Sequence, residues 1–484
     1  MKKFISVILA VLTFCFLFGI SACTVTPEDD NFDEKLLDEI DLTADEGYSG
    51  TLNIKTNSED GEVLIMQTLI DAFTKKYPYI KVNYTQELLD NYYASITNDI
   101  GVAEQTGDYS AVPDVFWLSQ DRIDSFYNLE RVLFPLSKID ERDENFSSDI
   151  LVDEAKSVSV VGDELYMIPR DFNQVVMYFN QDIFDAAGVD YPTAQMSKDD
   201  FVKMLADLRT GLNNSDAKND YGVPYKEAVT NLVDVNSQWD SWVWPLAKSF
   251  CAEVVNENGE AAMNSEEMYN AVAFWKSLRD NNYVGTISTT NSGVNFRMQQ
   301  SAIYFHARAV LTDIIKSTKQ IKGVQNLGVT AIPQFGPEYA IGGGSSGYAM
   351  YLNAAHKTEA WLFLKFVLSE EGQNAFCSTG NGIPSVKSML DDENAVWRQY
   401  ESDAFGTAFD VDAFIYGMDK DPKPFSSTRD FFQYIPISIQ TDVLTCLRSC
   451  FTVIDTENNT EQDLRDQIAN QNSLIEYYIE RSKN

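Results

Sequence analysis

Hydrophobic and polar residues change their period twice near the start of the folded part of the chain. Residues 51–55 alternate with period two, which predicts a strand. Apolar residues then recur at helical spacing over residues 63–73, and Pro78 ends the predicted helix. Residues 80–84 alternate again. A strand, a helix and a second strand in this order form a βαβ unit, which implies a parallel sheet.

Beyond this unit the sequence pattern continues to predict alternating strands and helices. Residues 115–117 form an apolar strand, and polar residues follow directly from Ser119. Ligands bind at the carboxyl ends of strands in open α/β sheets, so this end is a candidate site. Further strands are predicted over residues 175–179 and 327–332, and Ser197 caps a long amphipathic helix. From residue 358 onward the pattern is mostly helical, and we find no internal repeat.

The amino terminus carries an export signal. Two lysines are followed by an apolar run over residues 4–18, and Ile20-Ser21-Ala22 leads directly into Cys23. This arrangement is typical of a secretory signal, and the cysteine at the cleavage point resembles the acceptor of a bacterial lipoprotein. The run is shorter than the roughly 20 residues of a spanning helix. An ordinary signal peptide or a membrane anchor is the alternative to a lipid-modified Cys23.

The chain is strongly acidic, with a formal net charge of -36 over 484 residues. This charge argues against binding to nucleic acid or to anionic lipid surfaces, and most of it is expected to be a solvated surface. Residues 24–49 concentrate ten acidic residues against one lysine. Such a segment repels itself, so residues 23–49 are predicted to form a flexible tether.

Catalytic and metal-binding motifs are weak. Residues 343–347 fit G-x-S-x-G, but no acidic residue lies between Ser345 and the downstream His356, so a flexible turn that offers backbone N-H groups is favoured over a nucleophile elbow. The chain contains only two histidines, which is too few to favour a histidine-based active site or a zinc site. Cys446 and Cys450 could meet on one helix face, although buried thiols are favoured over a disulfide. We predict no catalytic residue, no metal and no cofactor.

Aromatic residues give the remaining signal. Trp239, Trp242 and Trp244 cluster in a polar stretch with amide and carboxylate neighbours. Flat rings beside hydrogen-bonding groups suit a sugar, whose faces are apolar and whose rim is polar. Packing in a core is an equal alternative for each single tryptophan.

Several stretches, taken in order, carry a resemblance to a known family. They are residues 113–117, 165–171, 178–184 with 187–189, 363–369 with 371–373, and 382–384. Their order resembles that of the bacterial extracellular solute-binding proteins, the class that includes maltose-binding protein and serves ABC importers of sugars. The resemblance runs from about residue 51 to about residue 377.

This resemblance implies a two-lobed, periplasmic-binding-protein-like α/β fold of type II, with parallel-dominated sheets, flanking helices and an interlobe hinge. Crossings between lobes are expected near residues 169–173, 304–308 and 354–359. The expected division is a lipoprotein signal peptide over residues 1–22, the acidic tether over 23–49, lobe 1 over 50–170 and 306–357, and lobe 2 over 171–305 and 358–484.

The resemblance also implies a binding site between the lobes. Its expected residues are Glu59, Trp117, Ser119, Asp171, Asn173, Trp239, Trp242, Trp244, Arg308, Gly343 and Gly344. The chain departs from the family where Ala307-Arg308-Ala309 replaces a frequent Gly-Arg-Trp, and His306 precedes it. For His306 we favour packing at the hinge, and the alternative is that it faces the cleft.

Together these features predict a lipid-anchored substrate-binding protein on the extracellular face of the cell membrane. It is expected to be a monomer that closes on a mono- or oligosaccharide and delivers it to ABC permease subunits. The alternatives are a surface glycan-active enzyme and an adhesion or scaffold lipoprotein without transport.

Overall fold

The computed structural model describes residues 32–285, 293–399, 406–452 and 459–483. The predicted signal peptide and Cys23 lie outside the described residues. The chain divides into two compact units, the first ending at Ile40 and the second spanning Asp41–Asn484. In the first unit, Asp33 caps the 3-10 helix η1 (Glu34–Glu39). Turns follow over residues 41–48. These residues therefore differ from the coil expected for the acidic segment, because Asp33, Asp41 and Asp45 accept hydrogen bonds from nearby backbone N-H groups.

The first lobe is built on a five-stranded mixed sheet with the order β2-β1-β3-β13-β6. Strands β1 and β2 pair in parallel from Gly50 and Ile80 onward, and α2 connects them, so the predicted βαβ unit is confirmed. Strand β13 enters antiparallel to β3 and β6. The strands are β1 (Gly50–Asn57), β2 (Ile80–Glu87), β3 (Val115–Ser119), β6 (Ile168–Pro169) and β13 (Ser346–Met350).

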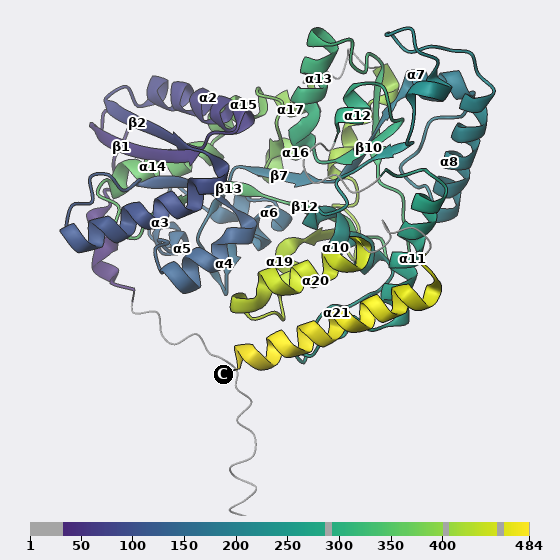
Figure 1. Cartoon of the computed structure of the whole chain (residues 1–484). Helices are drawn as coiled ribbons and strands as arrows, with labels where there is room; N and C mark the ends of the chain where they lie inside the picture. The colour runs from purple at the N-terminus through teal and green to yellow at the C-terminus, as the bar shows by residue number, and fades with distance from the viewer. Residues whose placement is uncertain (1–31, 286–292, 400–405, 453–458, 484) are drawn as a thin grey trace, which may run out of the picture. The chain divides into compact units, whose positions relative to one another are not determined.

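Helices α2, α3 and α14 contact this sheet, and α15 packs against α2 (Figure 1). Helix α2 ends at Lys76 because Pro78 follows, and Pro disfavours helical geometry in the residue before it. The helices of this lobe are α2 (Asp60–Lys76), α3 (Leu89–Thr106), α4 (Ile123–Ser125), α5 (Leu136–Asp140), α6 (Asp153–Ser157), α14 (Lys357–Leu368) and α15 (Glu370–Cys377), with a hairpin of β4 (Val160–Val161) and β5 (Glu164–Leu165).

The second lobe is built on a four-stranded sheet with the order β11-β8-β10-β9. Both β10 and β11 run antiparallel to β8, whereas β9 is parallel to β10. The strands are β8 (Val176–Asn180), β9 (Val233–Asp234), β10 (Ile303–His306) and β11 (Leu327–Ala331). The helices are α7 (Gln181–Ala187), α8 (Lys198–Asn213), α9 (Tyr225–Ala228), α10 (Asp240–Ser249), α11 (Glu266–Asp280), α12 (Val294–Arg297), α13 (Leu311–Gln320), α19 (Thr428–Phe432), α20 (Gln440–Thr452) and α21 (Glu461–Ser482).

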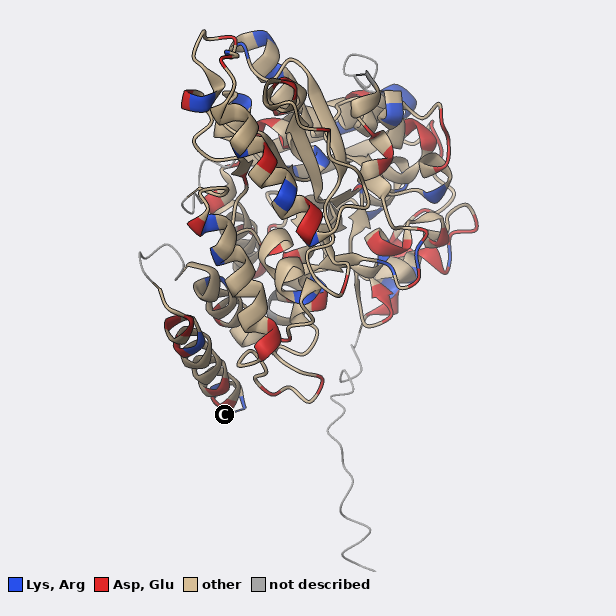
Figure 2. Cartoon of the chain, turned by 90° about the vertical axis from the view of Figure 1, so that its right-hand side faces the viewer, with Lys and Arg blue, Asp and Glu red and all other residues tan. Residues whose placement is uncertain are grey.

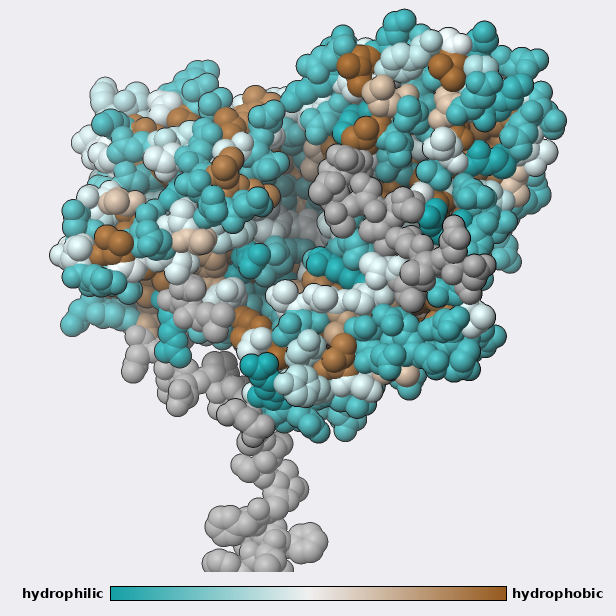
Figure 3. Space-filling model, viewed as in Figure 1, coloured by the Kyte–Doolittle hydropathy of each residue, from teal (hydrophilic) through white to brown (hydrophobic). Residues whose placement is uncertain are grey.

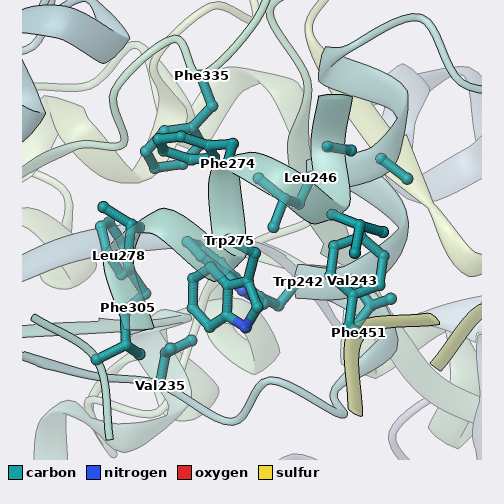
Figure 4. Packing of buried hydrophobic residues seen from close by; sticks show 14 of the residues in the cluster. Val235, Trp242, Val243, Leu246, Phe274, Trp275, Leu278, Phe305, Phe335 and Phe451 are labelled. Carbon is teal, nitrogen blue, oxygen red and sulfur yellow. The ribbon is translucent and has the colours of Figure 1, made fainter. Parts of the chain in front are cut away.

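The core of the second lobe is aromatic. Trp242 of α10 packs against Trp275, Phe305 and Phe335, with 4.7 Å between the ring centroids of Trp242 and Phe305 (Figure 4). Apolar residues of α20 and α21 belong to the same cluster of buried side chains. The C-terminal helices are therefore part of this core, although they follow the last crossing in the sequence.

A third, four-stranded sheet joins the two lobes, with the order β14-β7-β12-β15. The chain leaves the first sheet at β6 and enters this one at β7, and it returns from β12 to β13 through Ser345. The strands are β7 (Asp171–Gln174), β12 (Ile341–Gly344), β14 (Ile383–Pro384) and β15 (Phe425–Ser427), and α16 (Lys387–Leu390), α17 (Val396–Gln399) and η7 (Val411–Ile415) lie between β14 and β15 in the sequence.

The two-lobed α/β class is confirmed, but the sheets are mixed rather than parallel-dominated. In the first lobe, strand β13 returns from the joining sheet and enters antiparallel to β3 and β6, whereas in the second lobe both neighbours of β8 run antiparallel to it. The division of the chain also differs from the expected one. Strand β11 lies in the second lobe, and α14 and α15 pack on the first. Consequently neither residues 304–308 nor residues 354–359 form a crossing.

Two further expectations concern the membrane and the cysteines. No helix within the described ranges is long and apolar enough to cross a bilayer. Cys446 and Cys450 are buried free thiols, as favoured from the sequence, and burial raises the pKa of Cys446 to about 11. Cys377 is also buried, whereas Cys251 is exposed.

Candidate functional site

A cavity of about 740 Å³ lies between the two lobes, and the joining sheet forms part of its lining. Figure 3 shows the surface hollowed between the lobes. The lining side chains come from both lobes and are mostly polar. They are Asn57, Ser58, Glu59, Asp60, Glu62, Leu64, Ile65, Leu89, Trp117, Ser119, Gln120, Arg170, Asp171, Asn173, Trp239, Ser241, His306, Ala307, Ala309, Thr312, Asp313, Lys316, Ser345, Ser346 and Asn381, with Gly61, Gly343 and Gly344.

A second hollow of about 750 Å³ lies elsewhere on the second lobe, where Phe250, Tyr339 and Lys420 contribute to its lining. No residue of the predicted site lines it. The cavity between the lobes is therefore the candidate site, because it combines both lobes with the predicted side chains.

Trp117 forms the first-lobe wall of the cavity. It lies on β3 two residues before the strand ends, and its ring stacks on Tyr93 with 5.9 Å between ring centroids. Its indole Nε1 is buried and has no hydrogen-bond partner among the described residues. The same is true of Asn173 Oδ1 on β7. Buried polar atoms without a hydrogen-bond partner are uncommon, and both of these belong to residues that line the cavity.

Trp239 and His306 form the second-lobe wall. Trp239 precedes α10 as its N-cap residue, and His306 ends β10. Their rings stack with 4.5 Å between centroids and an interplanar angle of 16°. Burial lowers the pKa of His306 from 6.5 to about 4. His306 is therefore neutral near pH 7. The sequence favoured packing at the hinge for this residue. The structure shows it both packed against Trp239 and lining the cavity.

The floor contains a buried ionic cluster. Arg170 forms an ion pair with Glu62 of α2, donates to Tyr348 Oη at 3.0 Å and lies 3.5 Å from Asp171 Oδ2. Asp171 Oδ1 accepts the backbone N-H of Ser346 at 2.9 Å. Burial raises the pKa of both carboxyl groups, and the positive charge of Arg170 acts in the opposite direction. The cluster fixes the start of the first crossing to the first lobe.

Gly343 and Gly344 belong to strand β12 and not to the flexible turn expected from the sequence. A Cβ on Gly343 would lie 2.5 Å from Asn173 O, and one on Gly344 would lie 2.3 Å from Gln120 Nε2. Gln120 Nε2 also donates to Gly343 O at 3.4 Å. Close packing of β12 against the backbone of β7 therefore favours glycine at 343, whereas the close contact of Gly344 is with the end of the Gln120 side chain.

The cavity rim carries more negative than positive charge. Glu59, Asp60 and Asp313 are exposed carboxylates, and Lys316 is an exposed cation. None of the four forms an ion pair within the described part of the chain. Figure 2 shows acidic residues spread over many helices and loops, so the rim shares the acidity of the whole surface. An anionic ligand would meet a repulsive field here.

Most of the predicted site residues meet at this cavity, and three do not. Trp242 is only 4% exposed and lies in the second-lobe core, and Trp244 packs against Phe431. Arg308 is 1% exposed, its guanidinium lies 4.8 Å from the ring centroid of Phe414, and it donates to Trp397 O at 2.6 Å. The predicted residues that line the cavity are Glu59, Trp117, Ser119, Asp171, Asn173, Trp239, Gly343 and Gly344.

Sequence reasoning missed two groups of lining residues. Asn57 and Ser58 lie at the carboxyl end of β1, where the rule that placed Ser119 would have found them. Thr312, Asp313 and Lys316 of α13 carry no such signal, because their position depends on how α13 lies beside the crossing. Thr312 Oγ1 is hydrogen-bonded to Asn381 Oδ1 at 2.9 Å.

The serine of the G-x-S-x-G motif makes structural contacts. Ser345 Oγ donates to Asp171 O at 2.7 Å, and strand β13 follows in place of the helix that a nucleophile elbow requires. His356 Nδ1 instead pairs with Asp114 Oδ2 at 2.9 Å. Ser345 and His356 therefore pair with different residues and not with each other. Among the described residues, no group of three or more His, Cys, Asp or Glu could hold a metal ion.

Comparison with known proteins identifies the family. Residues 68–403 match the bacterial extracellular solute-binding proteins. The chain belongs to this family. A binding protein of Brucella abortus (strain 2308) is 26% identical over 239 residues, which cover 48% of this chain and 53% of that protein. The chain thus spans about half the length of the curated relatives it matches.

Solved structures share the fold of this solute-binding protein. The GacH receptor of Streptomyces glaucescens, studied unliganded and with acarbose, has a TM-score of 0.66 at 16% identity, covering 89% of this chain and 99% of the receptor. An ABC substrate-binding protein of Listeria monocytogenes in complex with cycloalternan has a TM-score of 0.66 at 17% identity. That match covers 88% of this chain and 99% of the Listeria protein. UgpB of Mycobacterium tuberculosis in complex with glycerophosphocholine has a TM-score of 0.68 at 18% identity. That match covers 90% of this chain and 100% of UgpB.

Proposed function

We propose that this solute-binding protein is the substrate-binding component of an ABC importer and takes a neutral mono- or oligosaccharide between its lobes. The observation that carries the proposal is the pair of tryptophans on one cavity, Trp117 from the first lobe and Trp239 from the second. Flat aromatic surfaces pack against the apolar faces of sugar rings.

The polar side chains between these tryptophans support the same ligand class. Ser119, Asn173, Ser241 and Ser346 line the cavity with hydroxyl and amide groups. Sugar hydroxyl groups both accept and donate hydrogen bonds, so they can pair with these hydroxyl and amide groups. The charged groups of the floor already satisfy one another through Arg170. This leaves neutral groups as the principal contacts for the ligand.

Closure of the lobes follows from the position of the cavity. A ligand that contacts both Trp117 and Trp239 binds most tightly when the lobes approach, so it shifts the population toward the closed state. The strands that connect the lobes, β6 to β7 and β12 to β13, are the segments that would bend.

A thermal-shift screen with calorimetry tests the ligand class. The panel contains maltotriose, cellobiose, lactose and xylobiose, with glucuronate, glycerophosphocholine, amino acids and dipeptides as the competing classes. We expect one neutral sugar to raise the melting temperature, because a ligand at 100 times its Kd stabilises the native state by about 2.7 kcal/mol. A shift with an amino acid, a dipeptide or glycerophosphocholine and none with a sugar would refute the carbohydrate assignment.

The two alternative functions give different results in the same assay. A glycan-active enzyme would return altered sugar, so chromatography of the sugar after incubation separates catalysis from binding. An adhesion or scaffold protein with an unused cleft would show no shift with any small molecule. We expect the bound sugar to be recovered unchanged.

We further propose that Cys23 carries the lipid that holds the protein at the extracellular face of the membrane. The support is the sequence pattern of residues 2–23 alone. Cys23→Ser should release the protein from the membrane fraction or leave it unprocessed, and mass spectrometry of the wild-type amino terminus should find acyl chains on Cys23. An unacylated mature terminus elsewhere would refute the anchor.

A further inference from the structure

The tautomer of His306 is fixed by a backbone contact. The N-H of Ala307 donates to His306 Nδ1 at 2.9 Å, so Nδ1 acts as the acceptor. In a neutral imidazole the other ring nitrogen then carries the proton. His306 therefore holds its hydrogen-bond donor, the Nε2-H group, on the side of the ring away from Nδ1.

The Nε2-H group of His306 has no hydrogen-bond acceptor among the described residues. His306 lines the cavity between the lobes, and its Nε2 makes no hydrogen bond to any described residue. Nε2 is also absent from the buried polar atoms that lack a partner, so it is accessible. The ring is stacked on Trp239 at 4.5 Å, which fixes its plane as well as its tautomer.

The groups around His306 keep it neutral. Burial, joined by the positive charge of Arg297 on α12, lowers the pKa of His306 to about 4. Tyr304 lies on the same strand with 5.4 Å between ring centroids, and Trp239 covers one face. The other charged groups of the second-lobe rim are Asp313 and Lys316 on α13, and Glu59 and Asp60 face them from the first lobe. None of these four forms an ion pair with the imidazole in the described structure.

We propose that His306 determines ligand specificity by donating its Nε2-H to an oxygen of the sugar that contacts Trp239. This inference rests on the proposed function, and it names the residue that orients the sugar on the second-lobe wall. Stacking on the apolar face of Trp239 does not fix the orientation of a sugar ring. The imidazole of His306, which has a fixed plane and tautomer, offers a single hydrogen-bond donor in a fixed position. A sugar with an acceptor oxygen at that place is preferred over an epimer without it.

The first test uses the ligand-free protein, with a variant needed only to assign the signals. The chain has two histidines, His306 and His356, so ¹⁵N NMR of the imidazoles gives two spin systems, and His306→Phe assigns them. We expect His306 to show protonated Nε2 and unprotonated Nδ1 at pH 7, and to titrate near pH 4. A protonated Nδ1, or a midpoint near 6.5, would overturn the proposal.

The second test compares sugar binding by wild type and His306→Phe. Phenylalanine keeps an aromatic ring beside Trp239 and removes the donor. For whichever of maltotriose, cellobiose, lactose or xylobiose binds, we expect a 3- to 30-fold loss of affinity in the variant, as for one uncharged hydrogen bond. Wild-type affinity should not change between pH 8 and pH 5.5. The Nε2-H proton should also become protected from exchange when the sugar is added.

The outcomes separate this inference from the proposed function. If no sugar binds the wild type, both the proposed function and this role of His306 are refuted. If a sugar binds and His306→Phe binds it equally well, or if Nε2-H stays unprotected, only the role of His306 is refuted. Should His306→Phe melt at a clearly lower temperature, His306→Gln, which retains an amide donor, should recover part of the affinity.

Discussion

At the scale of single residues, Trp239 and Trp242 show how little the local sequence says about the role of a side chain. They lie three positions apart, yet Trp239 stands before α10 in extended backbone and borders the cavity, whereas Trp242 lies inside the helix and in the core. Their different surroundings follow from what packs against α10, which a single sequence does not contain.

These two tryptophans give the first prediction. Trp239→Ala should weaken sugar binding by at least tenfold with a small change in melting temperature, because the residue is half-buried and contacts the cavity. Trp242→Ala should instead destabilise the protein by about 3–5 kcal/mol, as for other large-to-small core changes. Calorimetry and thermal unfolding distinguish the two effects. Equal loss of affinity in both variants at a temperature where both are folded would contradict the assignment.

The second prediction concerns the effect of pH on stability through His306. Its pKa is about 4 in the folded protein and about 6.5 when unfolded, so the unfolded state binds the extra proton between these values. Stability is thus lost as pH falls from about 6.5 toward 4. The loss at pH 5 should reach at most about 2 kcal/mol, because the ring is partly exposed to the cavity. Denaturant unfolding of wild type and His306→Phe at pH 7 and pH 5 measures the difference, and identical pH dependence would contradict it.

At the scale of elements, the periodic segments were predictable and the irregular ones were not. Strands β1 and β2 and helices α2 and α8 appear where alternation and helical spacing place them. Ser197 and Asp200 form the capping box expected at the start of α8. The glycines of β12 were predicted as a loop, because glycine is common in turns and the sequence does not show that Asn173 and Gln120 approach this strand closely.

The packing of α8 against α7 gives the third prediction. Glycine to alanine inside a helix normally stabilises it by about 1 kcal/mol. In α8, however, a Cβ on Gly211 would lie 2.1 Å from Ala187 O, so Gly211→Ala should lower the melting temperature. The matched control is Gly101→Ala in α3, where no atom lies within 4 Å of the added Cβ and stability should rise. Thermal unfolding of both variants checks this, and stabilisation by both would contradict the close contact.

At the scale of the whole molecule, one buried cluster ties the first crossing to the first lobe. Glu62 comes from α2, Arg170 lies between β6 and β7, Asp171 starts β7, and Tyr348 of β13 completes the contacts. All four are buried. The cluster holds two carboxylates with one guanidinium, so Arg170 is the residue on which both depend.

The fourth prediction follows from this dependence. Arg170→Met should destabilise the protein by about 3–5 kcal/mol, because it leaves two buried carboxyl groups without their cation. Glu62→Gln added to Arg170→Met should recover part of the loss, since one of these charges is then removed. Urea unfolding of wild type, both single variants and the double variant forms the cycle. Strict additivity of the two changes would show that Glu62 and Arg170 do not depend on each other.

The sequence by itself determined the α/β class and the family, and it predicted eleven site residues of which eight line the cavity, because strand ends, helix caps and short family stretches are local features. The tertiary structure alone decided the rest. It placed β11 in the second lobe and α14 in the first, buried Trp242, Trp244 and Arg308, and brought His306 onto Trp239. The physical reason is that a chain crossing repeatedly between two lobes builds each core and the cavity from segments far apart in sequence, so the neighbours of a side chain are set by long-range packing.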